Sequence, residues 1–436
     1  MALLAVMALF IPEGKSVAVG GPVDPGDTAW LLTATCLVLL MTPGLSFFYG
    51  GMVSRKNVIS TMLQSFVALG VVSLIWVAFG FSLAFGDSWH GVIGDPRTFF
   101  MFRGVGGDTH PDLAPTIPLV LFAMFQLKFA IITPALITGS FAERVKFSGY
   151  LVFMALFTVF VYCPLAHWTW HPQGFLRQWG VLDFAGGTVV HMSAGLAALA
   201  GALFLGPRRQ HASGHTAPAS NIPYVLLGTG MLWFGWFGFN AGSSLGANAV
   251  AAGAVATTNT ASAAAMLTWM LFDVARGRRA SALGACIGAV VGLVAITPAA
   301  GYVSIGSSVF IGVLAAVVSN WAAHLKSRST LDDTLDVFPC HGVGGIVGML
   351  ATGLLARDVG LMAGKTHTML FHLLALVIVS AFAFTVSFVL YWLTDRLITL
   401  RVGEAQEAIG LDISQHDEFL ENDPFRQFGD MPPARD

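Results

Sequence analysis

The charged residues are spaced so widely that they divide the chain into long apolar runs. The first run lies between Asp27 and Arg55, and the second lies between Lys56 and Asp87. A helix that crosses the hydrocarbon core of a bilayer needs about 20 apolar residues. Later runs hold one or two such helices, within 112–143, 146–177, 183–208, 209–273 (two), 279–326 (two), 336–357 and 365–395. The pattern predicts an all-α membrane protein with eleven transmembrane helices.

The loops between these runs differ in positive charge. Loops after odd-numbered helices carry eleven Lys and Arg residues, and loops after even-numbered helices carry five. Because basic loops stay in the cytoplasm, we expect the N-terminus outside and the C-terminus inside. Residues 1–27 would form an external segment whose "MALLAVMALF" stretch is like a remnant signal sequence without its basic start. Residues 28–400 would form the membrane domain, and the polar tail 401–436 would pack on the cytoplasmic face or stay mobile.

The composition agrees with a membrane protein. Hydrophobic residues make up 55% of the chain and charged residues 11%, whereas soluble proteins carry about 25% charged residues. The net charge of −2 gives no reason to expect a nucleic-acid partner. None of the four cysteines forms a CxxC pair, so we expect packed thiols rather than a disulfide framework or a zinc site. No constellation suggests an enzyme, a cofactor or a bound metal.

Two features recur five helices apart. The stretch "AIITPAL" (130–136) in the third helix resembles "AITPAAG" (295–301) at the end of the eighth. His191 in the fifth helix likewise has a counterpart in the tenth, His341. Since five is an odd offset, the two halves must cross the membrane in opposite directions. The sequence therefore predicts an inverted 5+5 repeat plus one extra helix, an arrangement typical of transporters that bind substrate between the halves.

His191 and His341 lie deep inside apolar, glycine-rich runs. Ionisable residues at such depth are costly and are usually functional. We expect both imidazoles to be neutral, so that each offers one donor and one acceptor. Two such rings in contact would line a narrow pore for a small neutral solute. The alternative is that they are core histidines bonded to neighbouring carbonyl or hydroxyl groups.

Aromatic residues gather near the outer ends of three predicted helices. Trp170 ends "HWTW", Phe129 lies in "FQLKFA", and Phe239 lies in "LWFGWFGFNAGSS". Such runs are most often packing or an interfacial belt. Rings around a mouth would instead attract a small cation by about 0.5–2 kcal/mol each. Ser243 would add a hydrogen-bond acceptor, which favours a monovalent cation that can donate hydrogen bonds.

Five motifs resemble the ammonium transporter family (Amt/Mep, related to the Rh proteins), and the outer residues favour its Amt/Mep branch. In chain order they are "TPGLSFFYGG" (42–51), "FAIITPALITGSFAER" (129–144), "DFAGGTVVH" (183–191), "GWFGFNAGS" (235–243) and "DVFPCHGVGGIVG" (336–348). The resemblance implies a homotrimer with one pore in each subunit. It also implies that a PII-type regulatory protein binds the cytoplasmic face.

The resemblance assigns roles to the residues of the outer mouth. Trp170, Phe129 and Ser243 match the external site that recruits ammonium. Phe129 and Phe239 match two stacked rings that gate the pore. Asp183 matches a carboxylate that supports the recruitment site without touching the substrate.

The resemblance also assigns roles inside the pore. His191 and His341 match the twin pore histidines, and Trp236 matches a pore-lining tryptophan. Lys128 departs from the family pattern because it places a lysine beside the gate. A buried lysine is costly, so we expect its side chain to reach a polar surface.

These observations predict an ammonium transporter of the plasma membrane. Ammonium or methylammonium would be recruited at the mouth, lose its proton and cross as the neutral amine, because a bare cation in an apolar pore pays a large desolvation cost. The family suggests that a proton crosses separately. The alternative is an ammonium sensor of the same fold with little flux, which an appended signalling domain would favour. The tail spans only residues 401–436.

Overall fold

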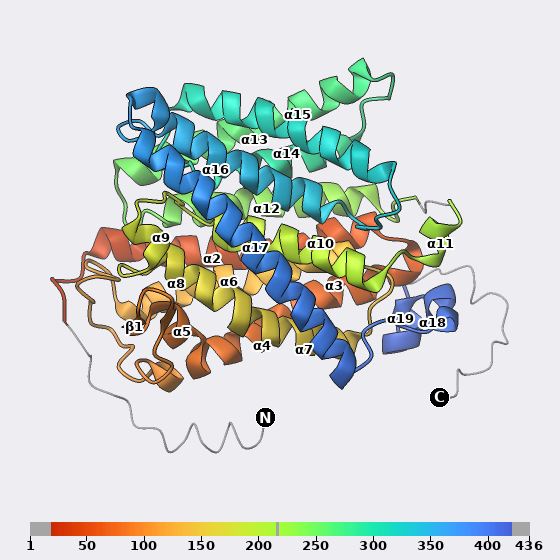
Figure 1. The fold of residues 1–436 in the computed structure, drawn as a ribbon, viewed down its shortest axis with the longest axis horizontal. Helices are drawn as coiled ribbons and strands as arrows, with labels where there is room; N and C mark the ends of the chain where they lie inside the picture. Colours follow the sequence, from red (N-terminus) through yellow and green to blue (C-terminus); the bar gives the residue numbers. More distant parts are fainter. Residues whose placement is uncertain (1–18, 215–217, 421–436) are drawn as a thin grey trace.

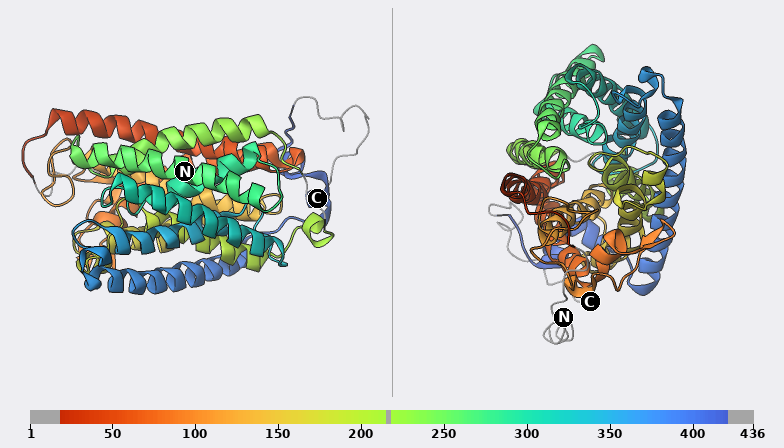
Figure 2. Two further views of the ribbon diagram at one scale, coloured as in Figure 1. Left: turned by 90° about the horizontal axis from the view of Figure 1, so that it is seen from above. Right: turned by 90° about the vertical axis from the view of Figure 1, so that its left-hand side faces the viewer.

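The chain folds into one long bundle of helices (Figure 1). The computed structural model describes residues 19–214 and 218–420. Within these ranges the only strands are a short antiparallel pair, β1 (Ser88–Trp89) and β2 (Ile93–Gly94). Figure 2 shows the helices end on, packed around one another. The prediction of an all-α architecture is confirmed.

Ten helical segments of the described residues are long and apolar enough to cross a membrane. Several consist of two or more successive helical elements. The segments are Pro25–Met52 (α2), Arg55–Phe85 (with α3 Val58–Phe66, α4 Ala68–Ile75 and α5 Phe81–Phe85), Leu119–Phe141 (α6), Phe147–Gln178 (with α7 Phe147–Phe157, α8 Cys163–Trp170 and α9 Phe175–Gln178), Gly187–Leu205 (η5 Gly187–Met192 and α10 Ser193–Leu205), Ile222–Gly242 (α12), Ala249–Ala275 (α13), Ile305–Ser327 (α15), Phe338–Leu355 (η6 Phe338–Val343 and α16 Gly344–Leu355) and Thr366–Leu397 (α17).

The predicted eighth helix is shorter than the others. It is α14 (Ala282–Ile296), which has 15 residues and ends where the "TPAAG" stretch begins. Pro298 has no backbone N–H to continue the helix, and the chain turns there before α15 begins at Ile305. A count of eleven membrane crossings therefore depends on α14 and stays a prediction.

Polar residues at the ends of the apolar runs start several helices. Asp24 accepts a hydrogen bond from the backbone N–H of Asp27 at the start of α2. Asn221 and Asn248 cap α12 and α13 in the same way, through the N–H groups of residues three positions later. A side chain that accepts from these free N–H groups stabilises the first turn. The residues that bound the apolar runs thus also fix where these helices begin.

Two glycine contacts bring helices unusually close together. A Cβ atom on Gly228 of α12 would lie 2.3 Å from the backbone nitrogen of Phe48 in α2. A Cβ on Gly195 of α10 would lie 2.1 Å from the backbone nitrogen of Gly342 in η6. Small residues allow such close helix packing in membranes. The second contact joins the two segments that carry His191 and His341.

The exposed side of the longest helix is apolar. On α17 the exposed residues include Leu370, Val377 and Phe388. A large apolar surface on a helix of this length is what contact with lipid requires. The exposed face of α17 therefore agrees with a multi-pass membrane protein.

The described part of the tail packs against the bundle. It forms α18 (Glu404–Ile409) and α19 (Leu411–His416), at the right-hand end in Figure 1. Leu411 and Asp412 are buried there. Of the two expectations for the tail, packing is what the structure has for residues 401–420, while 421–436 and the "MALLAVMALF" stretch lie outside the described residues.

Candidate functional site

A cavity of about 290 Å³ is lined by Phe129, Trp170 and Ser243, which the sequence singled out, and we call it the mouth. Segments far apart in the sequence contribute to it, among them α6, α8, the loop after α9 and the end of α12. Its lining includes Phe122, Gln126, Phe129, Trp170, Asp183, Ser243 and Tyr302. The structure thus brings together residues from separate predicted helices.

Two stacked rings close the inner side of the mouth. The ring centroids of Phe129 and Phe239 are 4.2 Å apart, with an angle of 33° between the planes. Trp170 meets Phe129 edge-on at 5.7 Å between centroids. Phe239 is fully buried and Phe129 is nearly so. Closely packed, buried rings at this place are compatible with the gate that the sequence predicted.

Ser243 lies where α12 ends. Its hydroxyl donates a hydrogen bond to the backbone oxygen of Phe239 at 2.9 Å. Since the hydroxyl proton is used in this bond, the oxygen can only accept from a solute in the mouth. That arrangement suits a cation with N–H groups to donate.

Asp183 is held by hydrogen bonds on both carboxylate oxygens. Its Oδ1 accepts from the N–H groups of Gly186 (2.8 Å) and Gly187 (2.7 Å). Its Oδ2 accepts from the N–H (2.7 Å) and the hydroxyl of Thr188. Gly186 has φ +122°, a conformation that favours glycine. The carboxylate therefore caps the start of η5, and its negative charge is favourable at a helix N-terminus.

The backbone of Asp183 also touches the mouth. Its carbonyl oxygen accepts a hydrogen bond of 3.1 Å from Nε1 of Trp170. The indole is thereby fixed in its orientation against Phe129. This geometry is what a supporting role for Asp183 requires.

His191 and His341 are in direct contact. Their Nδ1 atoms are 3.4 Å apart, and both residues are buried. One proton serves this contact, so one ring carries its hydrogen on Nδ1 and the other on Nε2. Nε2 of His191 has no hydrogen-bond partner among the described residues. This contact agrees with the predicted pair, and among the described residues each ring has the other as its hydrogen-bond partner.

Aromatic rings connect the gate to the histidine pair. The ring of His191 lies 6.0 Å from that of Phe239 and 5.4 Å from that of Trp236, nearly parallel to the indole at 18°. Nε1 of Trp236 donates to Oγ1 of Thr297 at 2.9 Å. Thr297 belongs to the repeated "TPA" stretch, which explains why that stretch lies next to the candidate pore.

Sequence reasoning missed Gln126. It lies in the mouth, one helical turn before Phe129 on the same face of α6. Its Oε1 is buried and has no hydrogen-bond partner among the described residues. A spacing of three residues from Phe129 was the available signal, because positions i and i+3 share a helix face.

Sequence reasoning also missed Asp333. It precedes His341 by 341 − 333 = 8 residues, and Asp183 precedes His191 by 191 − 183 = 8 residues. The carboxylate of Asp333 is fully buried and accepts from the N–H of Phe338 at 2.7 Å, at the start of η6. The equal spacing was visible in the sequence and agrees with a repeat.

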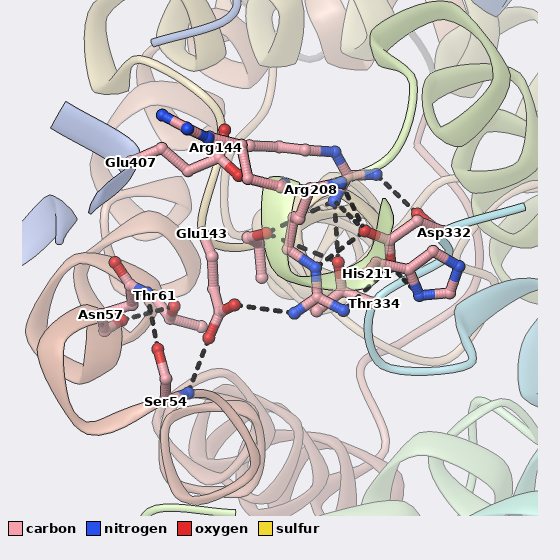
Figure 3. A network of polar contacts seen from close by, with 12 residues as sticks. Ser54, Asn57, Thr61, Glu143, Arg144, Arg208, His211, Asp332, Thr334 and Glu407 are labelled. Atoms are coloured by element: carbon pink, nitrogen blue, oxygen red, sulfur yellow. Dashed lines mark hydrogen bonds and ion pairs between the residues drawn. The ribbon is translucent and has the colours of Figure 1, made fainter. Parts of the chain in front are cut away.

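Ion pairs join the loops at the tail end of the bundle (Figure 3). Arg208 contacts Asp332 at 2.8 Å and Glu143 at 2.7 Å. Arg144 is fully buried and donates to the backbone oxygen of Asp332 at 2.6 Å. Burial lowers the pKa of Arg144 to about 10. Burial also raises the pKa of Asp332, but hydrogen bonds from Arg208 and the two positive charges outweigh it and hold this pKa at about 2.

The tail is tied to the same end of the bundle. Nζ of Lys56 donates to the backbone oxygens of Glu407 (3.2 Å) and Ala408 (2.6 Å). The carboxylate of Asp412 accepts from the N–H groups of Ile59 (3.1 Å) and Ser60 (2.8 Å) at the start of α3. A cavity of about 260 Å³ lies between the tail and the ion pairs.

The described residues hold no group of three or more His, Cys, Asp or Glu side chains arranged to bind a metal. The paired histidines also lack a third ligand.

Comparison with known proteins identifies the relatives of this chain. The model of the Ammonium Transporter Family matches residues 29–421. A putative ammonium transporter of Methanothermobacter thermautotrophicus is 46% identical, over 91% of this chain and 98% of that protein. Ammonium transporter Amt1 of Archaeoglobus fulgidus is 42% identical, over 90% and 98%.

Solved structures show the same fold. The crystal structure of Saccharomyces cerevisiae Mep2 superimposes with a TM-score of 0.82 at 35% identity, covering 87% of this chain and 88% of that one. A structure described as a sensor Amt protein has a TM-score of 0.83 at 30% identity, covering 90% and 98%.

Proposed function

Because this chain belongs to the ammonium transporter family and is thus a multi-pass membrane transporter rather than an enzyme, we propose a specific route for its substrate. Ammonium binds in the mouth between Trp170, Phe129 and Ser243. It loses a proton there, and ammonia passes the gate and the histidine pair. The observation that carries this proposal is the continuous line of rings from Phe129 through Phe239 to His191.

Binding in the mouth rests on complementary chemistry. The faces of Trp170 and Phe129 attract a cation by about 0.5–2 kcal/mol each. The oxygens of Ser243 and Gln126 offer acceptors for its N–H groups. Potassium has a similar size and the same charge but cannot donate hydrogen bonds. The site therefore favours ammonium and methylammonium over potassium and sodium.

Loss of the proton is required by the pathway beyond the gate. Ammonium dissociates into ammonia and a proton, and only the neutral product enters the space beside His191 and Trp236. A bare cation would lose its hydration there without gaining a counter-charge, at a cost of many kcal/mol. Ammonia can donate to or accept from a neutral imidazole. The proton would cross by a separate relay, for which the pair of His191 and His341 is a candidate.

The same proposal includes the orientation of the chain in the membrane, its oligomeric state and its partner. The mouth would face outward, with residues 1–27 outside and the membrane domain 28–400 crossing the plasma membrane eleven times as an inverted 5+5 repeat plus one helix. The tail 401–436 would lie in the cytoplasm. We propose a homotrimer with one pore in each subunit, and a PII-type protein as a possible partner at the tail end.

A sensor with little flux is the second candidate. The similarity to the sensor Amt protein favours it, while the similarity to the Mep2 structure and to the relatives named ammonium transporters favours the transporter. The two candidates differ in one measurable quantity, the amount of ammonium moved per binding event.

The deciding experiment measures current and ammonium uptake together in proteoliposomes that contain the purified protein. We expect both signals with ammonium and methylammonium, and neither with potassium or sodium. His191→Ala should slow uptake strongly but leave ammonium binding at the mouth, measured by tryptophan fluorescence. A potassium current as large as the ammonium current would overturn the proposed selectivity, and binding without uptake in the unmodified protein would favour the sensor.

A further inference from the structure

Arg177 places a positive charge on the wall of the mouth. The residue belongs to α9, at the opposite end of the bundle from the tail (Figure 1), and it is exposed. It lines the mouth, and within residues 19–214 and 218–420 its guanidinium takes part in no hydrogen bond or ion pair. A positive charge in a cavity that is proposed to bind a cation needs a physical explanation.

The electrostatic field of Arg177 extends to other side chains of the mouth. Burial raises the pKa of the Tyr302 hydroxyl, the charge of Arg177 opposes this rise, and the carboxylate of Asp183 adds to it. Tyr302 comes from the segment between α14 and α15 and lines the same cavity. The guanidinium is therefore near enough to act on an ion inside the mouth.

Two carboxylates line the mouth together with this cation. The charged residues of the lining, as far as the structure describes the chain, are Asp112, Arg177 and Asp183. The oxygens of Asp183 accept four hydrogen bonds at the start of η5. Asp112 is exposed, and its carboxylate has no hydrogen bond or ion pair in the described ranges. Arg177 thus offsets the free charge of Asp112 without being paired with it.

Without Arg177 the mouth would suit a different kind of cation. Carboxylate and amide oxygens are ligands that Mg²⁺ and Ca²⁺ prefer. Asp112 supplies a free carboxylate, and Gln126 supplies an amide oxygen that has no partner among the described residues. A divalent cation held by these oxygens would occupy the space that ammonium needs.

We propose that Arg177 excludes divalent cations from the mouth, so that the cavity stays open to monovalent ammonium. This inference rests on the proposed ammonium site. The energy of Coulomb repulsion is proportional to the charge of the ion, so for Mg²⁺ it is twice that for ammonium. Because a dissociation constant depends exponentially on energy, the factor by which Arg177 weakens Mg²⁺ binding is the square of the factor for ammonium. One arginine therefore costs little ammonium affinity and much divalent affinity.

The test compares Arg177→Gln with Arg177→Lys in proteoliposomes at low ionic strength, where charges are weakly screened. Two quantities are measured for each protein: the ammonium concentration that gives half-maximal current, and the Mg²⁺ concentration that halves the current at an ammonium concentration far below saturation. At a separation on the order of 10 Å, removing the charge should lower the first concentration about twofold to fourfold. The second should fall by the square of that factor, about fourfold to sixteenfold. Arg177→Lys keeps the charge and should stay close to the unmodified protein.

Two further variants serve as controls. Arg103→Gln removes an exposed positive charge from the loop before α6, outside the lining of the mouth, and should change neither concentration. Asp112→Asn removes the opposite charge and should raise both concentrations, again with the larger effect on Mg²⁺.

The inference fails if Mg²⁺ inhibits Arg177→Gln no more than the unmodified protein, or if both concentrations shift by the same factor. It also fails if Arg177→Lys behaves like Arg177→Gln. If the unmodified protein gives no ammonium current, the proposed transport fails instead. Binding of ammonium and of Mg²⁺, measured by tryptophan fluorescence, then still tests the role of Arg177.

Discussion

Replacement of Asp183 by alanine should destabilise the protein and abolish transport together. The change removes an acceptor of four hydrogen bonds, three from backbone N–H groups and one from the hydroxyl of Thr188. A buried donor left without a partner costs about 1–3 kcal/mol, and loss of a helix cap costs about 0.5–2 kcal/mol. Since the freed donors share one helix start, the losses are not fully additive. We expect a net loss of about 3–5 kcal/mol.

The effect should extend to the mouth. The carbonyl oxygen of Asp183 orients Trp170, and η5 places His191. If the start of η5 relaxes, both the indole and the imidazole lose their positions. Transport should therefore fall much further than the loss of stability alone would explain.

A graded series separates this explanation from general damage. Thr188→Val removes only the hydroxyl donor and should cost about 1 kcal/mol. Asp183→Asn keeps one acceptor oxygen but places an NH₂ group against the remaining donors, so its effect should lie between the other two. Asp333→Ala is the matched control, because it removes the corresponding carboxylate of the other half, which accepts from the N–H of Phe338.

The measurements are reversible unfolding in detergent, methylammonium uptake in proteoliposomes, and size-exclusion chromatography for the trimer. Stability and uptake should both fall progressively from Thr188→Val through Asp183→Asn to Asp183→Ala. A stable, assembled and active Asp183→Ala protein would refute it.

Three further predictions concern the pore and the tail end. Alanine replacements of His191 and His341 should be non-additive in uptake rate, with a coupling of about 0.5–3 kcal/mol in a double-mutant cycle; additive losses would separate the two roles. Burial raises the pKa of Asp412 to about 6, so the docked tail binds this proton more tightly than a free tail does. Docking of the tail should therefore weaken as the pH rises from about 4 to about 6. Hydrogen exchange of α19 should become faster over this range, and Asp412→Asn should remove the pH dependence. The pKa of Asp332 is held at about 2, so its contribution to stability should be present above about pH 4 and lost as the pH falls towards 2; Asp332→Asn should lose it at every pH.

Spacing of charges along the sequence was sufficient to find the membrane helices. An apolar run between charged residues predicts a spanning helix because no other structure satisfies its backbone in lipid. The end of the eighth helix at "TPAAG" was predicted and agrees with α14 ending at Ile296, but its length of only 15 residues was not foreseen. Nor was the π-helical geometry of η5 and η6, because it depends on contacts between helices such as that of Gly195 with Gly342.

The candidate site was predictable by residue type but not by contact. Trp170, Phe129 and Phe239 come from three helices, and only the fold brings their rings within 4.2–5.7 Å. Gln126 was overlooked because what distinguishes it is its Oε1 atom, which has no hydrogen-bond partner among the described residues, in a side chain that lines the mouth. Predicting such a feature requires knowing where a side chain points, and a sequence pattern indicates only the face of the helix on which the residue lies.

The mouth and the tail end of the bundle, which are the two ends of the proposed pathway, differ in how their charges are paired, and this difference bears on where a cation can be recognised. At the tail end the positive charges of Arg208 and Arg144 are matched by Asp332 and Glu143. At the mouth, by contrast, the rings of Phe129 and Trp170 and the unpartnered Oε1 of Gln126 lie around a cavity of about 290 Å³. On the proposed route, recognition of a cation therefore takes place at the mouth. On the same route the gate passes ammonia rather than ammonium to the histidine pair, because a bare cation in that apolar space would pay a large desolvation cost.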